Sequence, residues 1–521
     1  MPGRLLLAVL SGLLLSSAFE PLAWPLLLPL AVAGYVLAVR GLRARAALLP
    51  GAGFGLAFFL AHIWWLVDSI GTVAWLLLSG LEGAFYAALA PAVVVLLRLP
   101  FWPLWVAAAW VAGEGLRTEF PWSGMPWGRL SFAAVDTPLA PAIAYLGSAG
   151  LSFVLALLGC LVAAAVVAEG LRRRAVALGA AVALALVASV PTWLPWRLST
   201  SGTSTVAVVQ GGVPGAGNDV LFDPVGLTEN HVLATEGLAG DVAAGRVQQP
   251  DLVIWPENST ARDPFASVEV NEGIERAVAA IGVPVLVGGL VDGGPDHVYN
   301  QGIVWDPETG PGERYSKRHP VAFGEYIPGR GVVEALGLED FSQLARIPRD
   351  MLAGDRSEPL EVAGVAVADA ICFDIGFDDG LYAQQRAGAE LMVVQTSNAS
   401  YIFTDQVDQQ FAITRLRAIE SGRWLAVAST NGLSGVISPD GEVVATAERL
   451  GSAALVEQVE LKQGLTPGVW MGAWPSRLFA VSTLLGLLVG VLTYRRGAGW
   501  PERASRGRVS SSTSAGERQS A

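Results

Sequence analysis

The sequence predicts a multi-span α-helical membrane domain joined to a layered α/β domain with mixed strands that lies outside the membrane. Three observations indicate this architecture. The 521 residues are 52% hydrophobic and only 15% charged, which is less charge than soluble domains carry. Long apolar runs gather near both ends of the chain, as expected for membrane spans. Between residues 203 and 468 short strands alternate with helices, a pattern typical of α/β layers.

Eight apolar segments predict membrane helices, seven within residues 1–200 and a last one at 474–494. The first seven lie at about 5–19, 24–39, 47–67, 72–97, 100–116, 148–168 and 175–195. The first segment resembles a cleaved signal, but a second apolar run follows it at once, which favours a retained hairpin. One of the two cysteines, Cys160, falls in a span, so we expect no disulfide with the other, Cys372.

Arginine placement predicts how the chain is oriented. Alternate short loops are basic and hold Arg4, Arg40, Arg43, Arg45, Arg98, Arg172, Arg173, Arg174, Arg495 and Arg496. Basic loops face the cytoplasm, so both termini are expected inside and residues 203–468 outside, held by two membrane tethers. The tail 497–521 is rich in Ser, Arg and Gly and is expected to be disordered.

An aromatic segment from Glu114 to Trp127 falls on the predicted outer face. The favoured interpretation is an interfacial aromatic belt, because Trp and Tyr concentrate at the membrane surface. A lining for a lipid entrance is the sharper alternative. The acids in the spans, Glu82 and Asp68, look isolated, which argues against a transport pathway lined by charge.

The outer segment 203–468 is acidic, with 37 Asp and Glu against 16 Lys and Arg. That balance excludes a nucleic-acid partner, which needs a basic surface. The four histidines show no metal-ligand spacing, so neither a metal nor another cofactor is expected. Strands are predicted at 204–210, 251–255, 284–290, 301–305, 313–317, 362–371, 390–396, 424–429, 435–437 and 442–446, with a helix over 406–421.

Three of these strands end in chemically reactive side chains, Glu257, Lys317 and Cys372. Sites collect at strand ends in α/β sheets. A carboxylate can take a thiol proton, and an ammonium favours the thiolate and can stabilise an oxyanion. The thiol can then attack a carbonyl and hold the acyl group as a thioester. Each residue taken singly also fits a structural role; the combination favours a site.

The motifs around these residues resemble the three signatures of the nitrilase superfamily. They are Trp255-Pro256-Glu257, the stretch from Tyr315-Ser316-Lys317 to Glu325-Tyr326-Ile327-Pro328, and Ile371-Cys372-Phe373-Asp374. Seven spans, an outer domain of this type and one final span resemble the bacterial apolipoprotein N-acyltransferases over nearly the whole chain. The resemblance implies Glu257 as base, Lys317 as charge stabiliser, Cys372 as nucleophile and Glu325 as an assisting carboxylate.

Further positions match the family more loosely. The resemblance implies supporting roles for Phe373 and Asp374, where the family often has Tyr-Glu, and for Asn398. The segment Arg415 to Glu420 is likewise implied as structural support. Phe222 precedes Asp223-Pro224, where the family often carries a Trp on a mobile arm, so a substrate arm is implied there.

The resemblance implies transfer of a fatty acyl chain from a membrane phospholipid to the α-amino group of the diacylglyceryl-cysteine that begins an apolipoprotein. Partners would then be a phospholipid donor, a diacylglyceryl-modified apolipoprotein and the surrounding membrane lipids of the bacterial inner membrane. Two alternatives remain open at this stage. One is a membrane-bound amidase of the nitrilase type, which gives its thioester to water. The other is a transporter or channel whose outer domain binds a ligand.

Overall fold

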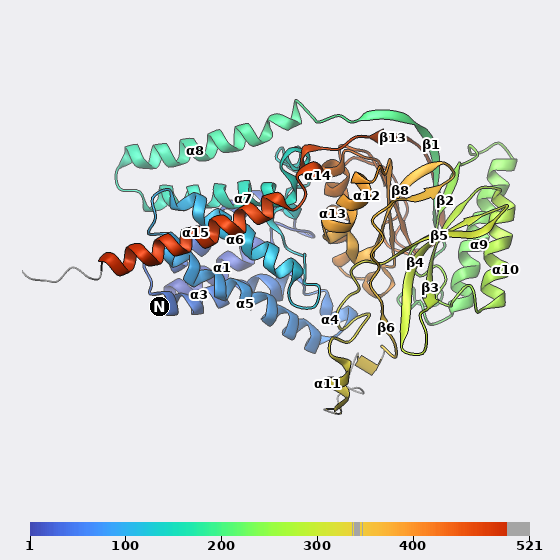
Figure 1. Ribbon diagram of the computed structural model, residues 1–521, viewed down its shortest axis with the longest axis horizontal. Helices are drawn as coiled ribbons and strands as arrows, with labels where there is room; N and C mark the ends of the chain where they lie inside the picture. The colour runs from blue at the N-terminus through green and yellow to red at the C-terminus, as the bar shows by residue number, and fades with distance from the viewer. Residues whose placement is uncertain (336, 338–343, 346, 498–521) are drawn as a thin grey trace, which may run out of the picture.

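The computed structural model describes residues 1–335, 337, 344, 345 and 347–497. It is elongated, with a helical bundle at one end and an α/β domain at the other, and the chain begins at the end of the bundle far from that domain (Figure 1). The predicted tail at 497–521 lies, from residue 498 onward, outside the described residues.

The bundle contains one helix in each predicted span. These helices are α1 (Pro2–Ser16), α2 (Leu28–Val39), α3 (Ala44–His62), α5 (Thr72–Leu96), α6 (Trp102–Glu119), α7 (Ile143–Val167), α8 (Leu171–Ser189) and α15 (Trp474–Gly497). Among the described residues, five helices are long and apolar enough to cross a membrane, and two more near the N-terminus are shorter and apolar.

One predicted span is less regular than expected, and one helix extends beyond its predicted span. The segment predicted at 47–67 ends as a helix at His62 and continues as the short α4 (Leu66–Ser69), because the backbone leaves the helical region at Ile63. Helix α7 contains a break at Gly147, whose φ of 66° lies in the left-handed region that favours glycine. The break leaves the Ser148 amide free for a side-chain partner, described below.

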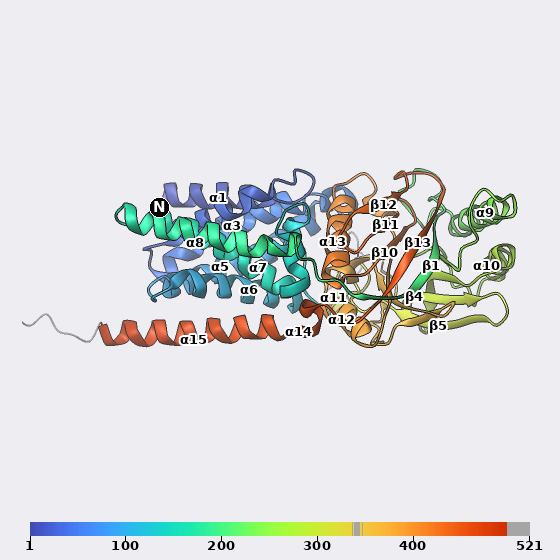
Figure 2. The same ribbon diagram turned by 90° about the horizontal axis from the view of Figure 1, so that it is seen from above.

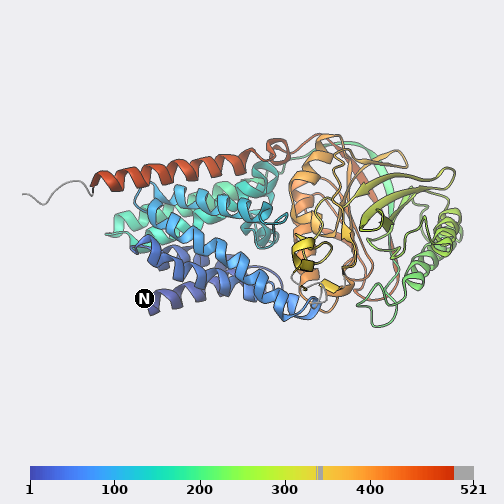
Figure 3. The ribbon, with the colours of Figure 1, turned by 60° about the horizontal axis from the view of Figure 1, so that its bottom comes forward.

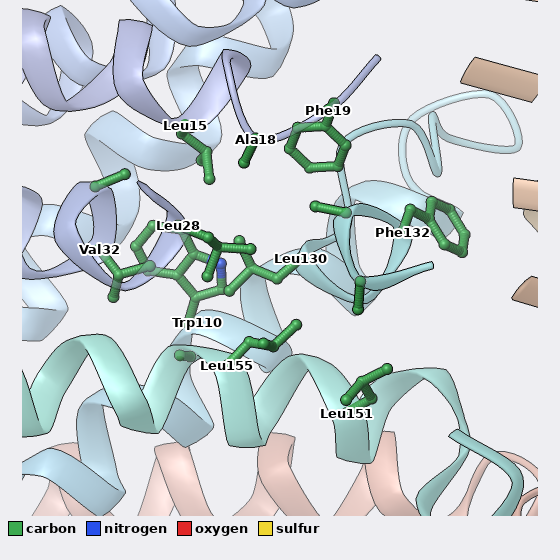
Figure 4. Packing of buried hydrophobic residues seen from close by; sticks show 14 of the residues in the cluster. Leu15, Ala18, Phe19, Leu28, Val32, Trp110, Leu130, Phe132, Leu151 and Leu155 are labelled. Atoms are coloured by element: carbon green, nitrogen blue, oxygen red, sulfur yellow. The ribbon is translucent and has the colours of Figure 1, made fainter. Parts of the chain in front are cut away.

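The bundle packs closely because small residues face one another. A Cβ added at Gly51 would lie 2.7 Å from the Tyr86 carbonyl oxygen, and one at Gly55 would lie 2.7 Å from the Gly83 carbonyl oxygen. The glycines therefore allow the backbones of α3 and α5 to lie in contact, as is common between membrane helices. Trp110 fills the space further along the core, between Leu28 and Leu155 (Figure 4).

One prediction about the spans is wrong: Glu82 is not isolated. Its Oε2 atom lies 3.4 Å from Nη1 of Arg117, and both side chains are about 1% exposed. The same Arg117 nitrogen donates to the Met125 carbonyl oxygen at 2.7 Å. Residue spacing in α5 and α6 does not reveal this pair, because the two residues are distant in sequence.

The α/β domain consists of two mixed sheets. In spatial order the first has β13 (Ala453–Gln463), β1 (Ser199–Gln210), β2 (Leu252–Ile254), β3 (Val285–Asp292), β4 (His297–Asp306) and β5 (Gly310–Ser316), with β6 (Asp350–Met351) beside β4. The second has β12 (Val443–Thr446), β11 (Gly435–Ile437), β10 (Leu425–Ser429), β9 (Leu391–Thr396), β8 (Val365–Ile371) and β7 (Leu360–Val362). The strand predicted at 362–371 is in fact the hairpin of β7 and β8, because Ala363 and Gly364 adopt positive φ and turn the chain.

Helices cover both outer faces of this sandwich. Helices α9 (Pro224–Ala243) and α10 (Val268–Ile281) lie on the first sheet, at the end of the molecule far from the bundle (Figure 2). Helices α12 (Asp379–Arg386) and α13 (Gln406–Ser421) lie between the second sheet and the bundle. The short α11 (Arg330–Ala335) and α14 (Pro467–Met471) complete the chain. The predicted α/β layered fold is confirmed as four layers, αββα.

The α/β domain is not simply held by two tethers, as the sequence suggested. One buried apolar cluster runs from the bundle into the layer of α12 and α13, where it includes Leu381, Ile413 and Leu416. Figure 3 shows α13 lying directly against the bundle. Since burial of apolar surface drives such contacts, the bundle and the α/β domain form one continuous core.

Candidate functional site

The fold brings Glu257 and Lys317 to the same edge of the first sheet. Strands β2 and β3 are parallel, and β4 is antiparallel to both β3 and β5, so β5 runs in the same direction as β2. Glu257 follows β2 and Lys317 follows β5. Both residues therefore lie at the same end of the sheet, where the parallel strands β2 and β5 finish.

Lys317 lies between two carboxylates. Its Nζ atom donates to Oε1 of Glu257 at 3.2 Å and to Oε1 of Glu325 at 2.6 Å, and the lysine side chain is fully buried. Glu257 also accepts from Nδ2 of Asn300 and from the Ser397 amide, each at 2.7 Å. The ammonium and the carboxylate of Glu257 are thus held in place from several elements.

These contacts fix the charge of the lysine. Burial by itself lowers the pKa of Lys317, but the carboxylates of Glu257 and Glu325 raise that pKa well above its usual value. Burial raises the pKa of Glu325, and the neighbouring Lys317 opposes that effect. Lys317 is therefore an ammonium at neutral pH, placed to stabilise negative charge that develops beside it.

Cys372 begins the 3₁₀ helix η6 (Cys372–Gly376) at the end of β8. Its φ of 52° lies in the left-handed region, which is unusual for a residue with a side chain. Asn258 and Phe323, beside Glu257 and Glu325, also have positive φ, 56° and 61°. Such conformations cost roughly 1–3 kcal/mol each and persist only where the surroundings hold them. The backbone is strained at three points around one site.

The thiol of Cys372 is half-buried and protonated at rest. Burial, followed by the carboxylate of Glu257, raises the pKa of Cys372 to about 12, while Lys317 lowers it. The ammonium thus favours the thiolate, as the sequence predicted, but burial and the carboxylates outweigh it. Attack by Cys372 therefore requires a base that removes the proton as the new bond forms.

The raised pKa of Cys372 predicts an unusual pH dependence for the rate at which this thiol is alkylated. Only the thiolate reacts with iodoacetamide, so the rate for Cys372 should keep rising with pH up to at least about pH 10. An ordinary thiol would level off near its pKa of about 8.5. Cys160 is fully buried in α7, so the rate reports on Cys372. Glu257→Gln removes a neighbouring negative charge and should speed alkylation at pH 8. A plateau near pH 9 in the unmodified protein would contradict this description.

The loosely matched residues have different positions. The Asp374 carboxylate accepts from the amides of Arg318 and His319, at 3.2 and 2.8 Å, and from the Tyr315 hydroxyl at 3.0 Å. It therefore ties the segment after Lys317 to the segment after Cys372. The Phe373 ring stacks on Trp127, with centroids 5.6 Å apart.

The remaining two predicted positions lie further from the chemistry. Asn398 is buried and donates to Oε1 of Gln410 at 3.0 Å, and its own oxygen accepts from the Ser429 hydroxyl at 2.8 Å. Phe222 is 70% exposed, and its ring faces Gly215 in the same loop. Phe222 therefore lies at the surface just before α9. It takes no part in the hydrogen bonds that join Lys317 to Glu257 and Glu325.

Three further residues that the motifs do not indicate lie near Cys372 or the residue after it. The Thr396 side chain lies near enough to Cys372 to lower the pKa of the thiol slightly. Tyr401 is close enough that the charges of the site act on its phenol, and its ring meets Trp65 of the bundle edge-on at 5.5 Å. Trp127 is 2% exposed and donates to Oε1 of Gln409 at 3.1 Å. Trp127 therefore does not contribute to an interfacial belt, whereas Phe120 and Trp122 of the same segment are 61% and 50% exposed; its place in the aromatic segment was the only signal.

A half-buried thiol, a buried ammonium and two carboxylates in an αββα domain define a class of thiol enzyme attached to a membrane bundle. Known protein families match both the α/β domain and the membrane bundle. Residues 205–463 match the carbon-nitrogen hydrolase family, and residues 11–161 match the apolipoprotein N-acyltransferase N-terminal domain.

The whole chain also has curated relatives. It is 36% identical to the apolipoprotein N-acyltransferase of Mycolicibacterium smegmatis, covering 93% of this chain and 84% of that protein. It is 31% identical to the enzyme of the same name from Ralstonia nicotianae, over 95% of this chain and 94% of the relative. A solved structure with more distant similarity is Saccharomyces cerevisiae Nit3, of the nitrilase superfamily, at 17% identity and a TM-score of 0.36, covering 50% of this chain and 91% of that one. The chain belongs to the apolipoprotein N-acyltransferase family, and it is a membrane-bound acyltransferase.

Proposed function

We propose that this protein moves a fatty acyl chain from a phospholipid, through a thioester on Cys372, to the α-amino group of an N-terminal diacylglyceryl-cysteine. The observation that carries the proposal is the buried Lys317 between Glu257 and Glu325, beside a thiol at a strained strand end. Family membership supplies the substrate class, since the relatives carry the name apolipoprotein N-acyltransferase.

In the first half-reaction Glu257 takes the thiol proton while Sγ of Cys372 attacks the ester carbonyl carbon. The resulting oxyanion is stabilised by the Lys317 ammonium. When the intermediate collapses, the ester C–O bond breaks and the leaving alkoxide takes the proton from Glu257. The products are a lysophospholipid and an acyl thioester on Cys372.

In the second half-reaction the acceptor amine attacks the thioester carbonyl. Glu257 removes a proton from the attacking amine and returns it to the departing Cys372 sulfur. An amide bond forms, and the thiol is restored. Glu325 and Asn300 act on this cycle indirectly, because each hydrogen-bonds a member of the Glu257–Lys317 pair.

The test is a reaction of the purified protein with a phospholipid and a synthetic diacylglyceryl peptide, followed by mass spectrometry. The proposal predicts a peptide heavier by one acyl group together with lysophospholipid. Free fatty acid as the main product, with the peptide unchanged, would instead identify a hydrolase of the amidase type. The transporter alternative predicts neither product.

We also propose that the α/β domain faces away from the cytoplasm. Arg4 donates to the carbonyl oxygens of Ala38 and Arg40 at one end of the bundle, the end far from the α/β domain (Figure 1), and basic loops face the cytoplasm. In intact cells a membrane-impermeant thiol reagent should label a cysteine placed at the exposed Glu308 but not one placed at Arg173, in the basic first turn of α8. Labelling at Arg173 alone would reverse the orientation.

A further inference from the structure

The segment that follows the predicted nucleophile is held by one buried arginine of α13. Nε of Arg417 donates to the Ile375 carbonyl oxygen at 2.9 Å, and Nη2 donates to the carbonyl oxygens of Gly376 and Phe377 at 3.0 and 3.1 Å. The arginine is 1% exposed. Three consecutive carbonyls, beginning three residues after Cys372, therefore point at a single guanidinium, whose planar fork can serve several acceptors at once.

The same segment is tied to the membrane bundle by a second arginine. Asp378 accepts from Nη2 of Arg417 at 2.7 Å and, through both oxygens, from Arg129 at 2.9 and 3.1 Å. Arg129 belongs to the chain between α6 and α7, and both guanidinium groups lie over the Phe132 ring, at 5.4 and 5.5 Å from its centre. Figure 4 shows Phe132 at the edge of the bundle core. Burial alone would raise the pKa of Asp378, but the two arginines hold it well below its usual value.

A third contact links the arginine to helix α7. Nη1 of Arg417 donates to Glu420, whose other oxygen accepts from the Ser148 amide at 2.8 Å and from the Tyr382 hydroxyl at 2.6 Å. The Ser148 amide can donate to Glu420 because the break of α7 at Gly147 interrupts the hydrogen bonds within the helix. Two separate parts of the bundle are thus linked to Arg417, each through one carboxylate. Arg129 is linked through Asp378, and Ser148 at the α7 break is linked through Glu420.

We propose that Arg417 is a positioning residue for the reaction of Cys372, and that Arg129 of the membrane bundle completes its effect through Asp378. Cys372 has a left-handed backbone, a conformation that persists only when its neighbours are fixed. Arg417 fixes the backbone of Ile375 to Phe377, which begins three residues after Cys372. The membrane bundle therefore helps to set the position of the thiol, and this inference rests on the proposed role of Cys372.

The inference is tested by comparing two arginines of α13. Arg415, two residues before Arg417, also joins α13 to the membrane part, by an ion pair with Asp136 at 2.8 Å, but it does not touch the 375–378 segment. Arg417→Lys keeps the positive charge and loses the planar fork; Arg415→Lys is the matched control. Each variant is measured for melting temperature, for the rate of Cys372 acylation by phospholipid alone, and for the rate of Cys372 alkylation by iodoacetamide.

We expect Arg417→Lys to slow acylation about 10²-fold, the effect of a misplacement of about 1 Å, with little change in KM for phospholipid and with a changed alkylation rate. Arg415→Lys should acylate within about 2-fold of the unmodified protein. If Arg417→Lys does not fold, Asp378→Asn is used in its place. This change keeps the three carbonyl contacts of Arg417 but weakens the bidentate pair between Asp378 and Arg129. It should slow acylation roughly 10-fold. Combining Asp378→Asn with Arg129→Lys should add little further loss.

Equal acylation and alkylation rates in Arg417→Lys and Arg415→Lys would overturn the inference, as would additive losses in Asp378→Asn and Arg129→Lys. These outcomes differ from failure of the proposed function. If the unmodified protein forms no acyl-enzyme at Cys372, the proposed function falls, and the alkylation rates alone then decide whether Arg417 positions the thiol.

Discussion

Cys372→Ser is expected to abolish acyl transfer, with a loss on the order of 10⁶-fold, the scale seen when an enzyme loses its nucleophile. The burial and the neighbouring carboxylates that already raise the pKa of the thiol would act more severely on a hydroxyl, which is far harder to deprotonate. Glu257 could not then generate the nucleophile. Lysophospholipid release from phospholipid alone measures this step.

The matched control is the other cysteine. Cys160 is fully buried in α7, so Cys160→Ser should retain lysophospholipid release within a few-fold. Substantial release by Cys372→Ser would show that another group accepts the acyl chain, and equal losses in the two variants would indicate a general folding defect.

Lys317→Met is expected to lower both activity and stability. It leaves the buried carboxylate of Glu257 and the partly exposed carboxylate of Glu325 without their shared cation, and breaking a buried pair in this way costs about 3–5 kcal/mol. Loss of a charge that stabilises an oxyanion typically lowers the rate about 10²–10³-fold. Acylation rate and melting temperature should therefore fall together.

Lys317→Arg separates the two effects. It keeps a positive charge near Glu257 and Glu325 but replaces a compact ammonium with a larger planar group in a fully buried site. We expect much of the stability to return and the rate to remain depressed by about 10²-fold. The only other lysine, Lys462, pairs with Glu460 on β13, so Lys462→Arg is the control and should be neutral. Full activity in Lys317→Arg would remove the lysine from the mechanism.

Strand ends could be predicted from the sequence because the signal is local. Apolar β-branched runs mark the strands that end shortly before Glu257 and Cys372, and the hairpin turn at 306–310 marks the strand that ends before Lys317. The four-layer fold brings Lys317 into contact with Glu257 and Glu325. The hairpin at Ala363 and Gly364 was missed, since the apolar pattern continues across the turn.

The contacts between the two parts of the molecule could not be predicted in the same way. Arg129 meets Asp378, and Trp127 meets Phe373, across about 250 residues of sequence. No periodicity records such a pairing. The aromatic segment was accordingly interpreted as a membrane belt, and Glu82 as isolated, although Trp127 packs under the α/β domain and Glu82 pairs with Arg117.

The most direct test of the covalent mechanism is the intact mass of the protein after incubation with phospholipid and no acceptor. A thioester on Cys372 predicts a mass increase of one acyl chain, located on the peptide that contains Cys372 and reversed by hydroxylamine. The increase should be absent from Glu257→Gln even though its thiol alkylates faster. An unmodified mass, while lipopeptide acylation still proceeds once the acceptor is added, would contradict the thioester and require direct transfer between the two bound substrates.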